Sequence, residues 1–179
     1  MDTADKRARG LMAHGDSRKL QALKALTTLL AGVTPANGHD FDLTGKVYRG
    51  RGLFGAEQSV PFVSIVEPDR SDPAAELAGQ QRKVRLEWWA LLVQGWATGD
   101  AENPTDVLYN LMAAVESRVA LLLDPADNAF RLGGLVADTR IGPGYIPAEM
   151  PNAAICFYLP IELRIGMNVA DPWAVSTKL

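Results

Sequence analysis

The strongest constraint on the fold comes from one segment near the end of the chain. Between residues 155 and 165 an apolar side chain stands at every second position: Ile155, Phe157, Leu159, Ile161, Leu163 and Ile165. Successive side chains of a β-strand point to opposite faces of a sheet, so this spacing predicts a long strand with one buried face. Such a strand needs partner strands and a second layer that covers its apolar face.

Four other segments have the composition of strands. Val84 to Trp96 alternates in its first half and is apolar on both sides in its second half, which predicts a central strand buried on both faces. Shorter strands are predicted at Lys46 to Arg49, at Val60 to Glu67 and at Gly133 to Arg140. The chain therefore supplies about five strands for one sheet.

Two segments have the apolar spacing of helices. The first follows Asp16 or Ser17 as a capping residue and carries leucines every three or four positions as far as Leu30. The second begins with Asn103 as the cap and Pro104 at the first helical position, and Asp124-Pro125 closes it. Each helix has one apolar side, as expected for a helix that lies across a sheet.

The resulting order of elements is α-β-β-β-α-β-β, with the strands in hairpin-like succession. This order favours an α+β fold, with a single mixed, mainly antiparallel sheet of about five strands flanked by two main helices. We expect residues 1–16 to form a mobile N-terminal arm, residues 17–173 to form a single domain, and residues 174–179 to form a C-terminal tail.

Composition excludes several classes of protein. Of the 179 residues 47% are hydrophobic, which is sufficient for a core, and the net charge of −3 argues against a protein that wraps nucleic acid. A single cysteine, Cys156, rules out an intrachain disulfide and a multi-cysteine metal site. The polar start of the chain has no apolar region typical of an export signal, and no apolar stretch is long enough to cross a bilayer.

One glycine-rich segment matches a nucleotide-binding pattern. Gly50 to Gly55 reads G-x-G-x-x-G and follows a predicted strand, with Glu67 at about the distance expected for a ribose-binding carboxylate. The mechanism requires a helix N-terminus after the glycines, to hold the pyrophosphate. Only Ala56 to Ser59 separate the motif from the next predicted strand, so we interpret it as a turn.

No other segment predicts a reaction or a cofactor. His14 and His39 lie in predicted loops without a partner at metal-ligand spacing, and Cys156 is interpreted as a small buried hydrophobe. The acidic cluster around Glu67 and Asp69 is interrupted by Arg70 and reads as a solvated surface. We therefore expect a protein that is not an enzyme and that binds neither cofactor nor metal.

Two observations point to contacts between copies of the chain. Trp88 and Trp89 are adjacent in a strand and must point to opposite faces of the sheet, so one of them needs a cover beyond the helices. Pro160 removes a backbone donor from the last strand, which places that strand at an edge or at a bulge. Subunits that pack side by side would explain both observations, and so would helices on both faces of the sheet within one chain.

The order of elements resembles the tail terminator proteins of long-tailed bacteriophages, which are also called minor tail or tail completion proteins. The resemblance spans Ser17 to Trp173. It is carried by the N-terminal helix, the proline-led strand Val60 to Glu67, the long strand ending in Gly95 and Trp96, the helix Asn103 to Leu122, the strand at Gly133 to Val136, and the Asp171-Pro172 tail after the last strand.

The resemblance implies a structural virion protein at the junction of tail and neck, made in the cytoplasm of the host bacterium. Such proteins form a homohexameric ring that caps the tail tube, ends its polymerisation and provides an interface for the head-side connector. The partners would then be further copies of the chain, the tail-tube protein and the connector, while DNA passes through the lumen without specific binding. Alternatives are another neck or tail protein, such as a head-completion or tail-tube subunit, and a small nucleotide-binding enzyme.

Candidate interface residues come from the predicted loops and the strands just described. Extended loops on a rigid sheet commonly carry binding, so we expect contacts at Arg49 to Gly55, Asp69 to Arg82 and Ile141 to Glu149. The individual interface candidates are Arg49, Arg51, Phe54, Arg70, Asp72, Trp89, Tyr145 and Pro160.

Overall fold

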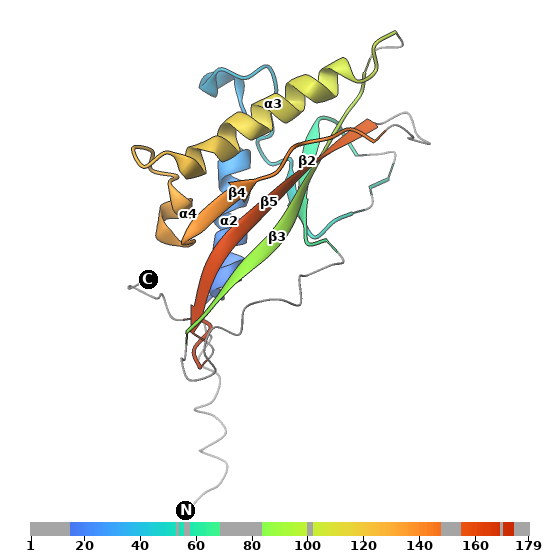
Figure 1. The fold of residues 1–179 in the computed structure, drawn as a ribbon. Helices are drawn as coiled ribbons and strands as arrows, with labels where there is room; N and C mark the ends of the chain where they lie inside the picture. The colour runs from blue at the N-terminus through green and yellow to red at the C-terminus, as the bar shows by residue number, and fades with distance from the viewer. Residues whose placement is uncertain are drawn as a thin grey trace, which may run out of the picture.

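The structure is a computed structural model that describes residues 15–52, 54–55, 58–68, 84–99, 102–147, 155–168 and 170–173. These residues form one five-stranded sheet with a layer of helices on one side (Figure 1). The α+β class and the mixed, mainly antiparallel sheet are confirmed. The strands are β1 (Val47–Arg49), β2 (Phe62–Val66), β3 (Val84–Ala97), β4 (Asp138–Ile141) and β5 (Ile155–Asn168). The helices are α2 (Arg18–Leu30), α3 (Asp106–Ala120) and α4 (Arg131–Gly134), with 3-10 turns η1 (Pro35–Asn37) and η2 (Leu121–Leu123).

The two long strands form the spine of the sheet. The strand order is β1-β2-β3-β5-β4, so β3 is the central strand, as its apolar second half predicts. Each of β3 and β5 has 14 residues, and they pair antiparallel over their whole length, from Val84 opposite Asn168 to Ala97 opposite Ile155. The outer strands are much shorter, so the ends of this long pair extend beyond β1, β2 and β4.

The first helix begins and ends as its sequence predicts. Ser17 is the capping residue of α2, and its Oγ accepts a hydrogen bond from the backbone of Leu20 at 3.4 Å. The buried side of α2 includes Leu26 and Leu30, neither of which is exposed. At the other end, Arg118 of α3 donates to the carbonyl of Leu29 at 3.4 Å, which joins the two helices.

The second helix starts two residues later than the sequence predicts. Asn103 and Pro104 precede α3, which begins at Asp106 with Thr105 as the capping residue and without a side-chain capping bond. The backbone of Asp106 donates to the carbonyl of Asn103 at 3.2 Å, so the Asn-Pro signal forms a turn that leads into the helix. The end of α3 is as expected, because η2 carries the chain to Asp124.

The strand predicted from Gly133 to Arg140 is wrong in its first half. Four consecutive residues, from Arg131 to Gly134, have φ between 51° and 86°, in the left-handed region that a strand never uses. They form the short turn α4, and β4 begins only at Asp138. The turn is held from α2, because the guanidinium of Arg18 donates to the carbonyls of Leu135 at 3.0 Å and Gly134 at 3.1 Å.

The predicted hairpin-like succession fails at the first two strands. Strands β1 and β2 are parallel, with Val47 opposite Val63 and Arg49 opposite Ile65. Parallel neighbours require a crossover of about a dozen residues, and the segment 50–61 is long enough to provide it. The crossover has to pass over one face of the sheet, and it passes on the side opposite the helices (Figure 1).

Pro160 is not at an edge of the sheet, because β5 lies between β3 and β4. The carbonyl of Pro160 accepts a hydrogen bond from the backbone N–H of Gly142 at 2.9 Å. In an antiparallel strand the N–H and C=O of one residue point to the same side, so the hydrogen bond that proline cannot donate would also have been on the β4 side. There β4 has already ended, and the chain rejoins β5 at Tyr145 opposite Tyr158. Two residues, 143 and 144, therefore lie opposite Leu159 alone. The bulge alternative is correct, with the extra residue in the segment that faces the proline.

Candidate functional site

The two faces of the sheet differ in what covers them. On β3 the apolar side chains Trp89, Leu91 and Val93 of one face are at most 5% exposed and belong to the core beneath the helices. The side chains of the other face are half-buried, and no described helix packs on them. We call this second surface the open face. Its members include Leu86, Trp88, Ala90, Leu92, Gln94 and Trp96 of β3, Tyr158, Pro160, Glu162 and Arg164 of β5, and Asp138 and Arg140 of β4.

The two adjacent tryptophans point to opposite faces, and the interface candidate among them lies on the inner side. Trp89 is 5% exposed, and Lys19 of α2 lies over its ring at 5.0 Å, so it has almost no surface to offer to a second molecule. Trp88 is the tryptophan on the open face. The reason is tertiary: α2 covers the face that carries Trp89 and Glu87, where Lys19 forms an ion pair of 2.6 Å with the Glu87 carboxylate.

Arginines flank Trp88 on the open face. The guanidinium of Arg140 lies 3.9 Å from the centre of the Trp88 ring, and that of Arg164 lies 5.8 Å from it. Arg140 also approaches the Glu162 carboxylate at 3.5 Å, and both of these charged side chains are largely exposed. This part of the open face therefore offers an aromatic ring surrounded by charges of both signs.

A cluster of aromatic rings occupies the other end of the open face. Phe62 and Trp96 stack at 4.8 Å between ring centroids, and Phe54 lies against both of them, at 4.3 Å and 4.8 Å. Tyr48 of β1 closes the cluster at 5.6 Å from Phe54. Arg51 places its guanidinium over the rings of Tyr48 and Phe54, at 5.1 Å and 4.8 Å. Phe54 is half-buried here, so the crossover segment itself covers this end of the sheet.

Backbone contacts fix the glycine-rich segment to the sheet. Gly50 has a φ of +67° and donates to the carbonyl of Ile65 at 2.8 Å, while the Ser64 hydroxyl donates to the carbonyl of Arg51 at 2.7 Å. Among residues 50–52, 54–55 and 58–61, which are the described part of this crossover, none is helical. The described residues thus provide no helix N-terminus for a pyrophosphate. The prediction of a simple turn is wrong in another respect, because the segment belongs to the crossover between the parallel strands β1 and β2.

A tyrosine pair lies at the point where the chain rejoins β5. Tyr145 is 52% exposed, and its ring is 5.3 Å from that of Tyr158. A hydrogen bond with Cys156, together with burial, raises the pKa of Tyr158 to about 12. Burial also raises the pKa of the Cys156 thiol, which is only 4% exposed. Both groups therefore stay neutral near pH 7, and a thiol held neutral is a poor nucleophile.

The structure brings most of the remaining interface candidates to the open face. Arg51 is exposed beside the aromatic cluster that contains Phe54, and Tyr145 and Pro160 lie on the side of β4 and β5. Arg49 is exposed as well, but it stands opposite Ile65 of β2 and therefore points to the other face, the one that the helices cover. Arg70 and Asp72 lie outside the described residues, as does the whole proposed contact loop from Asp69 to Arg82.

Sequence reasoning did not name Arg140 and Arg164 as candidates, and of the two adjacent tryptophans it selected Trp89, whereas Trp88 lies on the open face. A signal for them exists in the alternation of β5, where Tyr158, Pro160, Glu162 and Arg164 stand between the apolar residues. This pattern shows that one face of β5 is polar, but the pairing of β5 with β3 is needed to place Trp88 next to Arg164.

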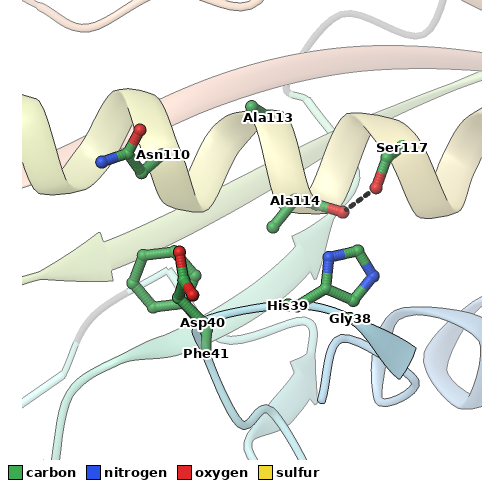
Figure 2. Close-up of a pocket in the computed structure, with 8 residues that line it drawn as sticks. All are labelled: Gly38, His39, Asp40, Phe41, Asn110, Ala113, Ala114 and Ser117. Atoms are coloured by element: carbon green, nitrogen blue, oxygen red, sulfur yellow. Dashed lines mark hydrogen bonds between the residues drawn. The ribbon is translucent and has the colours of Figure 1, made fainter. Parts of the chain in front are cut away.

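A polar hollow lies within the helical layer, between the loop after η1 and α3 (Figure 2). His39 is half-buried there and Asp40 is exposed, while the Ser117 hydroxyl donates to the carbonyl of Ala114 at 2.8 Å. The lining residues are Gly38, His39, Asp40, Phe41, Asn110, Ala113, Ala114 and Ser117. In the part of the chain that the structure describes, no three His, Cys, Asp or Glu side chains are grouped closely enough to hold a metal ion. His14 lies outside that part.

Comparison with known protein families finds none that matches the chain, and comparison with curated protein sequences finds no match either. Within the described residues, no helix has both the length and the apolar character needed to span a membrane.

Proposed function

We propose that this protein is a structural subunit of a bacteriophage virion, which assembles into a ring that caps the tail tube. The ring would add to the last layer of the tube, present a surface that tube subunits cannot extend, and offer that surface to the head-side connector. The mechanism is steric, so it requires no reaction and no cofactor. DNA would pass through the lumen of the ring without specific binding.

The observation that supports this proposal is the open face of the sheet. It carries Trp88 and Leu92 in half-buried positions, and no described helix covers it. Partly apolar surfaces of this kind mark sites of contact between protein molecules. A protein whose function is assembly would bury such a surface against its neighbours.

The charges of the open face also suit a lumen or a polar contact. On β4 and β5 it carries Asp138 and Glu162 beside Arg140 and Arg164, two of each sign. A surface with balanced charges does not hold DNA tightly, because phosphate binding needs an excess of positive groups. The net charge of −3 for the whole chain acts in the same direction.

Two other functions give different experimental results. A head-completion or tail-tube subunit shares the assembly surface, and a tube subunit would form extended filaments instead of rings. A nucleotide-binding enzyme is the candidate suggested by Gly50 to Gly55, and it would give a saturable heat on titration with a nucleotide. The contacts of Phe54 and Arg51 with the sheet do not favour it.

The proposal is tested by sedimentation velocity and negative-stain microscopy of the purified protein at high micromolar concentration. We expect closed rings that bind one end of purified tail tubes and stop their elongation. A single monomeric species at these concentrations, with no effect on tube length, would contradict it. If the purified protein formed extended filaments, it would instead be a tail-tube subunit.

A further inference from the structure

Strands β3 and β5 reach beyond their neighbours, which leaves backbone edges on both sides of the sheet without a partner strand among the described residues. Strand β2 pairs with β3 only from Leu92 to Trp96, and no described strand pairs with Val84–Leu91 on that side. On the other side β4 is the outermost strand of the described sheet. At this end the sheet is three strands wide, in the order β3-β5-β4. Such edges are templates on which another chain can add a strand.

The register determines which backbone groups point outward from these edges. In an antiparallel ladder, alternate residues direct their N–H and C=O groups to opposite sides. The backbone of Pro160 is hydrogen-bonded to Gly142, and the backbone of Tyr158 to Tyr145. The backbone N–H and C=O groups of even-numbered β5 residues therefore point toward β4, and those of odd-numbered residues point toward β3. The outward groups of β3 are therefore those of its even-numbered residues, such as Trp88 and Ala90. Those of β4 belong to Thr139 and Ile141.

The two open edges lie at the same height and run in the same direction. Arg164 of β5 stands opposite both Trp88 of β3 and Asp138 of β4, and Ile161 stands opposite both Leu91 and Ile141. Because β3 and β4 are each antiparallel to β5, they are parallel to one another. A second copy placed beside the first thus presents its β3 edge to the β4 edge of the first copy without inversion.

We propose that the subunits join through these edges, with β4 of one copy pairing in parallel with the Val84–Leu91 part of β3 in the next. The inference rests on the proposed assembly into a ring and names the contact that builds it. The contact is head-to-tail, because two different edges meet, and such contacts produce either rings or helical filaments. Since the two edges lie at the same height, each join adds no displacement along the strands, and the rotation between neighbouring copies then determines whether a ring closes.

The side chains at the two edges suit this contact. In the joined sheet, Arg140 of one copy lies on the open face beside Trp88 and Ala90 of the next. The small Ala90 side chain leaves room for a guanidinium, and Trp88 already accepts Arg140 over its ring within one chain. Trp88, which is half-buried within one chain, would then be covered further by the neighbouring copy.

Engineered disulfides test the contact, in a background with Cys156→Ser. The test variant combines Ala90→Cys and Arg140→Cys. Within one chain both positions are opposite Glu162, one on each side, so they are two strand spacings or about 10 Å apart, too far for a disulfide. In the joined sheet they belong to adjacent strands, about 5 Å apart. Mild oxidation should therefore produce a ladder of linked copies that ends at the size of the ring.

Three controls distinguish this ladder from random collision. Each single-cysteine variant should give no species larger than a dimer, and a mixture of the two should also stop at dimers. Gln94→Cys with Arg140→Cys should give no ladder, because Ser64 of β2 occupies the edge beside Gln94.

Electron microscopy of the same samples separates the possible failures. Rings with a ladder support both proposals. Rings without a ladder overturn the edge contact and leave the ring in place. A ladder in filaments supports the contact and overturns the capping function, while monomers without a ladder overturn both.

Discussion

The two faces of the sheet differ in burial because helices pack on one of them, and residue composition alone does not explain the difference. Leu91 and Leu92 are adjacent leucines in the middle of β3. Leu91 is 2% exposed beneath the helices, whereas Leu92 is half-buried on the open face opposite Pro160. An apolar residue in a central strand thus lies either in the core or on a surface available to a partner, depending on the layer above it.

Polar groups show the same contrast. On the covered face Glu87 is 8% exposed and forms a 2.6 Å ion pair with Lys19, and Arg18 is 3% exposed with two carbonyls as acceptors. Buried charges are tolerated only when they are paired in this way. On the open face Arg140 and Glu162 are 3.5 Å apart, with side chains 63% and 46% exposed. Such exposed pairs contribute little to stability and remain available to bind a partner.

The adjacent leucines provide the largest test of this contrast. We expect Leu91→Ala to lower the free energy of unfolding by about 2–5 kcal/mol, because it leaves a cavity in the core. Leu92→Ala should cost only about 1 kcal/mol and should weaken ring formation. Urea denaturation of both variants at low concentration, with sedimentation of the folded proteins, checks both effects. Equal losses of stability would show that the open face is covered within a single chain in solution.

The next test concerns how tightly the covered face is packed. A methyl group at Gly95 would collide with the ring of Phe157, which is fully buried opposite it. We expect Gly95→Ala to lower the stability by about 1–3 kcal/mol, because the ring has to shift within a packed core. Gly52→Ala is the matched control, since no atom lies within 4 Å of the added methyl group. Thermal melting of the two variants should differ clearly, and identical melting curves would refute this account of the packing.

A smaller effect is expected at the aromatic end of the open face. Phe54→Ala removes the ring that the crossover places against Phe62 and Trp96, and we expect a loss of about 1–2 kcal/mol because Phe54 is only half-buried. Near-ultraviolet circular dichroism should change along with the stability. Phe54→Leu should recover part of the loss by filling some of the same volume. An unchanged spectrum in Phe54→Ala would mean that the crossover is detached from the sheet in solution.

The smallest effect appears only at high pH. The pKa of Tyr158 is raised to about 12, mainly by its hydrogen bond with Cys156, while an unfolded tyrosine titrates near 10. The neutral phenol is favoured in the folded state, so its contribution to stability is complete below about pH 10 and is lost as the pH rises toward 12. Tyr158→Phe should therefore reduce the dependence of stability on pH in this window. Denaturation at a series of pH values measures it, and an unchanged slope would contradict the assignment.

Much of the fold follows from local patterns in the sequence. The alternation of β5, the apolar second half of β3 and the leucine spacing of α2 each predict their element correctly, because side-chain period and capping chemistry are properties of a few neighbouring residues. The beginning of β4 could not be predicted in the same way. Arg131 to Gly134 adopt left-handed backbone conformations, and contacts from Arg18, more than a hundred residues away, hold the turn that they form.

The sequence by itself determined the class of the fold, since the periods of its strands and helices depend on residue types and short spacings. The tertiary structure alone decided that β1 and β2 are parallel, that β5 lies inside the sheet, and that Trp88 faces outward while Trp89 lies in the core. Each of these depends on which distant segment packs on which side. The hydrophobic effect is non-directional, so it does not specify which face of an apolar strand is buried. The segments that pack on the strand determine that face.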